Sequence, residues 1–341
     1  MDRRQFVYLI GLLAGCNAST SIADTNNAQP TSATRSPPPS PAATPTRTPT
    51  TSSTPTATPQ DTETPTEEPP EPTPEETETP TEFEVRGSQQ LAEAERALTN
   101  VVDTFTDGYG SELTDVTASS TEFLNSTRDF QLVLARAQEE YIEASNAAGN
   151  RTQQTTADRM RGCWEFLRNT IRTQTEVITA YEYLISARDA FEQVEARAAN
   201  DAIANFETAR GRADSRYQDV LGSTAEEASV IPPISVSEHQ QKVAQFEGDI
   251  GVYTDLDDAL GEFAEGVKWL GYAKSEVDGE NRNVKRAIEQ ATEAEKRLRS
   301  ARRGLSDLID STGEDTTLVP TLNELRSVAT AKIEEAEEIG A

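Results

Sequence analysis

The chain has 341 residues, with 59 acidic and 31 basic side chains and a formal net charge of −28. This length accommodates one or two domains. A nucleic-acid-binding protein needs a basic surface that displaces counterions from phosphates. The acidic balance therefore argues against nucleic acid as a partner, and it also disfavours adsorption to anionic lipid headgroups.

A short apolar segment follows two arginines at the N-terminus. Arg3 and Arg4 precede the apolar run 6–14, which is shorter than the about 20 residues that a helix needs to span a hydrocarbon core. We therefore expect residues 1–15 to be a signal peptide and not a transmembrane helix. The paired arginines resemble a twin-arginine export signal.

The tetrapeptide Leu13-Ala14-Gly15-Cys16 directly follows this apolar run. It resembles a lipobox, the motif in which cleavage precedes the cysteine and the thiol carries a lipid. The resemblance implies that Cys16 holds the chain on the outer face of the cytoplasmic membrane. Because one acyl chain binds membranes only marginally, it also implies a two-chain lipid. A plain secretory signal with a chance cysteine is the alternative.

The basic residues are mainly arginine, and only six are lysine. Acidic excess, few lysines and abundant threonine resemble the proteins of salt-loving archaea, whose charged surfaces stay hydrated while salt screens their repulsion. With the N-terminal motifs, the composition resembles a haloarchaeal surface lipoprotein exported by the twin-arginine route. That route implies folding before export. Any acidic surface protein is the alternative reading of the composition.

A Thr/Pro/Glu-rich segment covers residues 16–85, and 15 of the 18 prolines of the chain lie in it. It has little apolar surface to offset the entropy of ordering, so we expect a disordered linker. Proline biases such a linker towards an extended polyproline II conformation. Its Thr-Pro-Thr repeats resemble mucin-like stalks that carry O-linked sugars. A tether without sugar is the alternative.

Beyond residue 85 the chain is rich in Ala, Glu, Arg, Gln and Leu, which favour helices. Apolar residues recur at steps of three and four, and no stretch alternates with period two. We expect an all-α fold, an elongated bundle of about six or seven long antiparallel helices in two halves, 86–222 and 237–341. The expected helices cover residues 88–107, 111–148, 156–198, 201–221, 237–278, 284–308 and 318–339.

No catalytic or metal-ligating pattern is recognisable. His239 is the only histidine, and we expect it exposed near a helix start at Ser237, where Gln240 would complete a capping box. One histidine cannot supply the paired Glu-x-x-His motifs of a di-iron bundle. Cys163 is expected to be a buried core residue, with an intermolecular disulfide as the alternative. We expect no enzyme activity, cofactor or metal.

Two Asn-x-Ser/Thr sequons lie beyond the linker, and each is a possible site of N-glycosylation. Asn150 follows Gly149 in an expected loop, where a glycan has room. Asn125 falls in an expected helix, which makes it the less convincing acceptor. A third sequon, at Asn17, adjoins the expected lipid site and would be crowded.

These features predict a lipid-anchored cell-surface protein that presents a helical interaction domain to another envelope protein. The role would be structural or protein-binding and not enzymatic. A solute-binding or sensory lipoprotein with a pocket between helices is the alternative. The residues considered for such a pocket are aromatic: Trp164, Tyr181, Tyr183, Trp269 and Tyr272.

Overall fold

The computed structural model describes residues 81–278, 282–313 and 316–341, which belong to one compact unit. The expected signal peptide, the lipobox with Cys16 and most of the expected linker lie outside the described residues. Structural statements below refer to the described residues alone.

The described residues are helical, and no strand occurs among them. The α-helices are α1 (Glu82–Thr106), α2 (Thr127–Ala147), α3 (Arg151–Glu192), α4 (Ala196–Leu221), α5 (Ala225–Ala228), α6 (Val236–Asp255), α7 (Asp257–Asp278), α8 (Val284–Ser311) and α9 (Val319–Gly340). The short 3-10 helices η3 (Leu113–Asp115) and η4 (Thr121–Ser126) lie between α1 and α2. The expected all-α bundle is confirmed.

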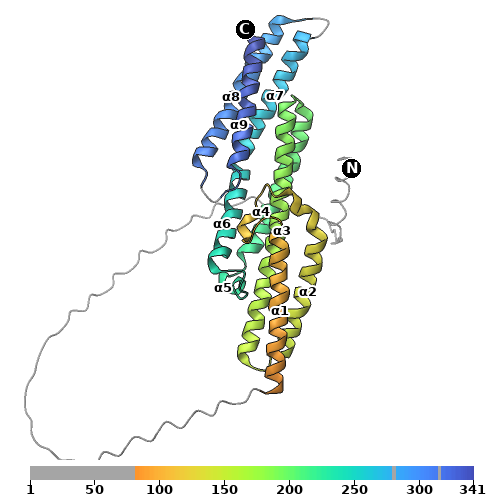
Figure 1. The fold of residues 1–341 in the computed structure, drawn as a ribbon. Coiled ribbons are helices and arrows are strands. Elements are labelled where there is room, and N and C mark those ends of the chain that lie inside the picture. Colours follow the sequence, from red (N-terminus) through yellow and green to blue (C-terminus); the bar gives the residue numbers. More distant parts are fainter. Residues whose placement is uncertain (1–80, 279–281, 314–315) are drawn as a thin grey trace, which may run out of the picture. The chain divides into compact units, whose positions relative to one another are not determined.

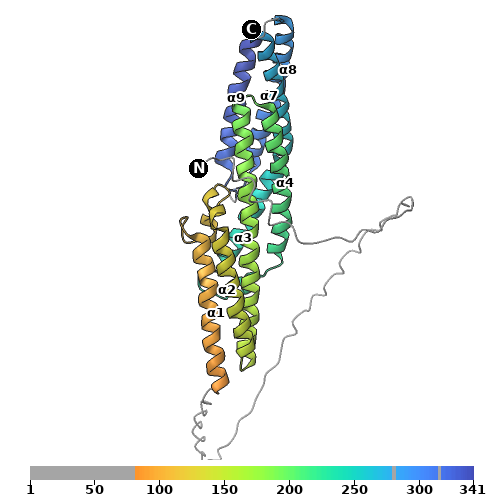
Figure 2. The same ribbon diagram turned by 90° about the vertical axis from the view of Figure 1, so that its right-hand side faces the viewer.

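Helix α3 is the element on which most of the others pack. It has 42 residues and so spans about 63 Å. It contacts α1, α2, α4, α5, α6, α7 and α9. Figures 1 and 2 show α4 returning along it, and α7, α8 and α9 lie against one another as successive neighbours.

One cluster of buried apolar side chains draws residues from both expected halves of the bundle. Phe105 of α1, Phe191 of α3 and Leu298 of α8 all belong to it. Phe191 stacks on Phe263 of α7 with ring centroids 4.0 Å apart. The two halves therefore share a core in the described structure.

The expected helix at 111–148 is wrong over residues 111–126. Residues 111–126 form η3, η4 and irregular turns, and α2 begins only at Thr127. Side chains here capture backbone N–H groups: Asp115 Oδ2 accepts from the nitrogens of Ser111 and Glu112 at 2.8 and 2.9 Å. The Ser120 hydroxyl accepts from Thr117 at 3.0 Å. Such local bonds compete with the helix, while the apolar spacing still mimics one.

The expected helix at 237–278 is two helices that meet at Leu256. The Leu256 side chain is buried, and its backbone nitrogen donates to the Val252 carbonyl at 3.1 Å. Asp257 and Asp258 then open α7, where carboxylates favour the positive end of a helix. The bundle consequently has eight helices of 20 or more residues among the described segments, where about six or seven were expected.

Two helix boundaries also differ from expectation. Helix α1 starts at Glu82, because Thr81 and Glu84 form a capping box, so the linker ends before residue 85. Helix α3 covers 151–192 and not 156–198. The chain leaves this helix at Val194, whose φ of 58° lies in the left-handed region that glycine usually occupies after a helix. The boundary between α3 and α4 therefore lies before Asn200, and no glycine or proline marks it.

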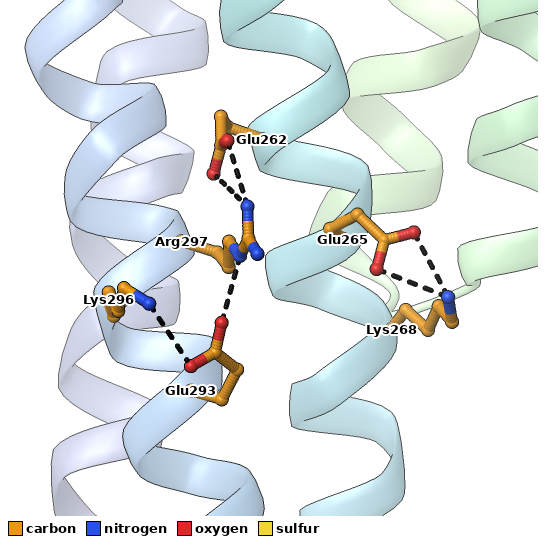
Figure 3. A network of polar contacts seen from close by, with 6 residues as sticks. All are labelled: Glu262, Glu265, Lys268, Glu293, Lys296 and Arg297. Carbon is orange, nitrogen blue, oxygen red and sulfur yellow. Dashed lines mark hydrogen bonds and ion pairs between the residues drawn. The ribbon is translucent and has the colours of Figure 1, made fainter.

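Ion pairs cross several helix contacts on the surface of the bundle. Figure 3 shows Arg297 of α8 between Glu262 of α7 and Glu293 of its own helix. Arg297 Nη1 lies 3.0 Å from Glu262 Oε1, and Arg297 Nε lies 3.0 Å from Glu293 Oε1. Such exposed pairs contribute little to stability individually.

Two glycines of α7 differ in the space that surrounds them. A Cβ added at Gly266 would lie 2.7 Å from Leu298 Cγ, whereas a Cβ at Gly261 would meet nothing within 4 Å. We expect Gly266→Ala to lower the free energy of unfolding by about 1–3 kcal/mol through overpacking. Gly261→Ala should raise it by up to about 1 kcal/mol through helix propensity. Denaturant unfolding of both variants at one salt concentration tests the contact, and equal effects would contradict it.

Candidate functional site

A row of polar side chains lies buried along one face of α6. Glu238, Lys242, Gln245 and Asp249 recur at steps of four, three and four, so they share a face of the helix. Lys242 is 0% exposed and Asp249 1%. A buried charge of this kind needs polar partners, and the row finds them in the irregular segment 111–120, in α3 and before α9.

Lys242 has three oxygen acceptors for its ammonium group. Its Nζ donates to the Val116 carbonyl at 2.7 Å, to Gln174 Oε1 at 2.7 Å and to Gln245 Oε1 at 2.8 Å. The nitrogen also lies 4.7 Å from the centre of the Phe246 ring, close enough for a cation–π interaction. All three N–H donors of a charged lysine are therefore used.

Gln174 and Gln245 are each oriented by a second hydrogen bond. Gln174 Nε2 donates to the Thr117 carbonyl at 2.9 Å, and Gln245 Nε2 donates to the Thr114 carbonyl at 3.1 Å. Because their amide nitrogens are occupied by carbonyls, their oxygens face Lys242. The four residues Lys242, Gln174, Gln245 and Asp249 are called the Lys242 network below.

Asp249 extends the network to the segment that precedes α9. Its Oδ1 accepts from the Thr317 backbone nitrogen at 2.7 Å and from Thr316 Oγ1 at 2.9 Å. Thr317 Oγ1 in turn receives a bond of 3.3 Å from the Ala118 nitrogen. Burial raises the pKa of Asp249, and the bonds from Thr317 and Thr316 and the charge of Lys242 oppose that rise.

Burial lowers the pKa of Lys242 to about 7, and the negative charges of Asp249 and Asp115 oppose the decrease. Lysines with such values serve as bases or nucleophiles in some enzymes. Here the best-defined cavities of the described residues are not lined by Lys242. The arrangement holds three segments of backbone together, and its amine is fully buried.

His239 is buried, and the expectation that it is exposed is wrong. Helix α6 is capped two residues earlier than expected, by Ser235, whose hydroxyl accepts from the Glu238 nitrogen at 3.0 Å. The expected box of Ser237 and Gln240 is therefore not the cap. His239 is 7% exposed, and its ring packs on Phe166 with centroids 4.6 Å apart. Burial lowers the pKa of His239.

Cys163 is buried as expected, and burial raises the pKa of its thiol to about 12. A thiol in this state is a poor nucleophile, and it is not accessible for an intermolecular disulfide.

The best-defined cavities are not lined by Trp164, Tyr181, Tyr183, Trp269 or Tyr272. The largest, about 950 Å³, lies along α1 and the start of α3 and has mostly polar lining residues. Trp164 instead donates from Nε1 to the Leu134 carbonyl at 2.9 Å. Within the described segments no group of three His, Cys, Asp or Glu side chains could hold a metal ion.

The two sequons of the bundle differ in how their asparagines are used. Asn150 caps α3: its Oδ1 accepts from the Gln153 nitrogen at 3.0 Å, and its Nδ2 donates to Glu84 Oε1 at 2.9 Å. Asn125 lies in η4 and not in an α-helix, and its side chain is exposed. Both asparagines are exposed, so N-glycosylation at Asn150 and at Asn125 stays a prediction.

The sequence analysis did not identify the Lys242 network. Polar residues on an amphipathic helix usually face water, so their spacing alone gave no reason to select them. One usable signal was that Lys242 is among only six lysines, and it lies beside Val243 at the start of the apolar stripe of α6. The expected sites at Arg3, Arg4 and Leu13 to Cys16 lie outside the described residues.

No protein-family model, curated protein or solved structure matches the chain. No described helix is long and apolar enough to cross a membrane.

Replacing Lys242 by methionine should remove a hydrogen-bond donor from the Val116 carbonyl and from the side-chain oxygens of Gln174 and Gln245. We expect Lys242→Met to lower the free energy of unfolding by about 3–5 kcal/mol, while Lys268→Met on the surface of α7 changes it little.

An unfolded lysine titrates near pH 10.4. Between about pH 7 and 10 the unfolded chain therefore binds more protons, and this group makes stability rise with pH.

The pH dependence gives a separate measurement. The stability difference between the wild type and Lys242→Met should be larger at about pH 9 than at about pH 6. Urea unfolding of both proteins across this range checks it. A difference that stays constant with pH would mean that Lys242 has an ordinary pKa.

The cap at the start of α3 gives a further prediction. Asn150→Ala should lower the free energy of unfolding by about 1 kcal/mol. Asn125→Ala should change it by less than about 0.5 kcal/mol, because its side chain is exposed. Denaturant unfolding of the unmodified proteins compares the two, and equal losses would show that Asn150 does not stabilise α3.

Proposed function

We propose that this protein is a surface lipoprotein, held by a lipid on Cys16, that presents its helical bundle to another envelope protein. The observation that carries the proposal is the order of features in the chain. Arg3 and Arg4, an apolar run and Leu13 to Cys16 come first, the Thr/Pro-rich segment follows, and the capped helix α1 comes after it. The role is structural or protein-binding and not enzymatic.

The start of α1 supports a tethered bundle. Thr81 accepts from the Glu84 nitrogen, and Glu84 Oε1 accepts from Asn150 Nδ2 at 2.9 Å. Gln153 Nε2 donates to the Glu84 carbonyl at 2.7 Å. The first turn of α1 is thus hydrogen-bonded to the start of α3 at the point where the proline-rich sequence ends. A force on the tether would be transmitted through these bonds to α3.

The length and charge of the chain fit an exposed position away from the membrane. About 65 residues separate Cys16 from Thr81, which corresponds to a reach of up to roughly 200 Å in a fully extended polyproline II conformation. Residues 82–341 contain 49 acidic and 27 basic side chains. Such a surface keeps a protein soluble in concentrated salt, where screening limits its self-repulsion, so we include a high-salt environment in the proposal.

Membrane partitioning tests the anchor. We expect the native mature chain to begin at Cys16, to carry the mass of a two-chain lipid and to stay with the membrane fraction. Cys16→Ser should move to the soluble fraction, because no covalent lipid would hold it. Cys163→Ser is the matched control and should stay on membranes. Intact-mass analysis and fractionation give the readout. A lipid-free native chain in the medium would refute the anchor.

A further inference from the structure

The apolar stripes of α7 and α8 become exposed towards the end where α7 stops and α8 starts. On α7, Ala273 is fully buried, and Val277, one turn later on the same face, is 38% exposed. On α8, Ala291 is buried, while Ile288 and Val284 precede it at helical spacing and are 37% and 65% exposed. The set Val277, Val284 and Ile288 is called the apolar tip below.

Helix α4 does not extend to the apolar tip. Its Arg210 pairs with Asp257 at the start of α7 at 2.6 Å. A Cβ added at Gly271 would lie 3.7 Å from Val194 Cγ1, and α4 begins two residues after Val194. The helices α4 and α7 therefore run antiparallel, and residues 272–278 of α7 lie beyond the start of α4.

The two helices of the tip are well formed and bonded to each other. Glu276 Oε1 of α7 lies 3.2 Å from Arg286 Nη1 of α8. Asn283 caps α8, because its Oδ1 accepts from the Arg286 nitrogen at 3.2 Å. Figure 1 shows α7 and α8 running together to this end of the bundle. Amphipathic helices bury their stripes in bundles of more than two, so the tip is a formed surface whose apolar stripe is left uncovered within the described residues.

The charges around the apolar tip balance, unlike those of the whole chain. Residues 274–289 contain four basic and four acidic side chains, whereas the chain has 31 basic and 59 acidic ones. A partner with a strong net charge of either sign therefore gains little attraction here. A second copy of the chain carries the same balanced set, and elsewhere the acidic excess of both copies would hold them apart.

We propose that the apolar tip binds the apolar tip of a second copy of this chain. Two hairpins related by a two-fold axis supply four helices, and the stripes of α7 and α8 from both copies then face one core. Because the contact is isologous, Asp278 of each copy can face Lys285 of the other. This inference goes beyond the proposed function, since the contact requires neither the lipid nor another kind of protein.

High salt should favour this contact. Two copies with a net charge of −28 repel each other, and the screening length falls from about 8 Å at 0.15 M salt to about 3 Å at 1 M. Salt does not weaken the burial of apolar side chains. We therefore expect the dissociation constant to fall as the salt concentration rises. A contact held by ion pairs would instead weaken, and that result would overturn an apolar interface.

Analytical ultracentrifugation of the full mature chain, residues 16–341, measures the association. Cys16→Ser removes any contribution of a lipid and serves as the parent protein. The ends of two helices bury less than the roughly 800 Å² per partner of a standard interface, so we expect a monomer–dimer equilibrium with a dissociation constant of about 1–100 μM. Val284→Glu should raise this constant about a hundredfold, because each dimer buries two such side chains. Leu132→Glu on α2, which is 61% exposed, is the matched control and should leave it unchanged.

Thermal unfolding at a concentration below the dissociation constant separates the contact from a structural role. The dilute Val284→Glu variant should melt within about 2 °C of its parent, because the Val284 side chain is mostly exposed in one copy. A much lower melting temperature would assign Val284 to the fold of the single chain and overturn the proposal.

Disulfide cross-linking tests the geometry of the contact. With Cys16 replaced, the remaining cysteine, Cys163, is buried, so an introduced thiol on the surface reacts alone. Val284→Cys should give a covalent dimer under mild oxidation, because the stripes of both copies face the same core. Leu132→Cys should give none.

Three outcomes would overturn the proposal. They are a chain that stays monomeric at high salt, a dimer that Val284→Glu leaves intact, and equal cross-linking through Leu132→Cys. If the monomer instead binds phosphatidylcholine vesicles through Val284, the occupant of the tip is lipid and not a second copy. The lipid anchor is tested separately by the location of Cys16→Ser in cells, so neither result decides the other.

Discussion

The three hydrogen bonds of Lys242 are the constraint on which much of the bundle depends. Lys242 is fully buried, so every N–H of its ammonium group needs an acceptor inside the fold. Its acceptors come from the irregular segment at Val116, from Gln174 of α3 and from Gln245 of α6 itself. A shift of any of the three segments would leave a buried charge short of a partner. The network therefore fixes their relative positions more narrowly than apolar packing would.

This constraint also explains why an unwound segment lies inside a helical protein. The turns around η3 and η4 leave carbonyl groups outside any helix, and a buried carbonyl needs a donor. Lys242, Gln174 and Gln245 supply donors to Val116, Thr117 and Thr114. Asp249 performs the complementary task, accepting N–H and hydroxyl groups of Thr316 and Thr317 before α9. One face of α6 thus satisfies the backbone of two loops that are distant in the sequence.

Apolar periodicity predicted the helices wherever buried side chains alone decide the structure, as along α4, α8 and α9. It failed where polar groups act on the backbone. Asp115 and Ser120 bond to nearby N–H groups and unwind residues 111–126, although Leu113, Val116 and Phe123 keep helical spacing. The breaks at Val194 and Leu256 carry no glycine or proline. The Lys242 network was invisible for a related reason, because a sequence does not tell whether a polar stripe faces water or other backbone.

The bonding capacity of the Lys242 network is filled inside the bundle. In the Lys242 network the three lysine donors and the Asp249 carboxylate have partners within the chain, so nothing is left over for a ligand, and its role is to hold the fold. Such an arrangement stabilises the fold by itself, because each segment that it joins supplies an acceptor or donor that another segment needs.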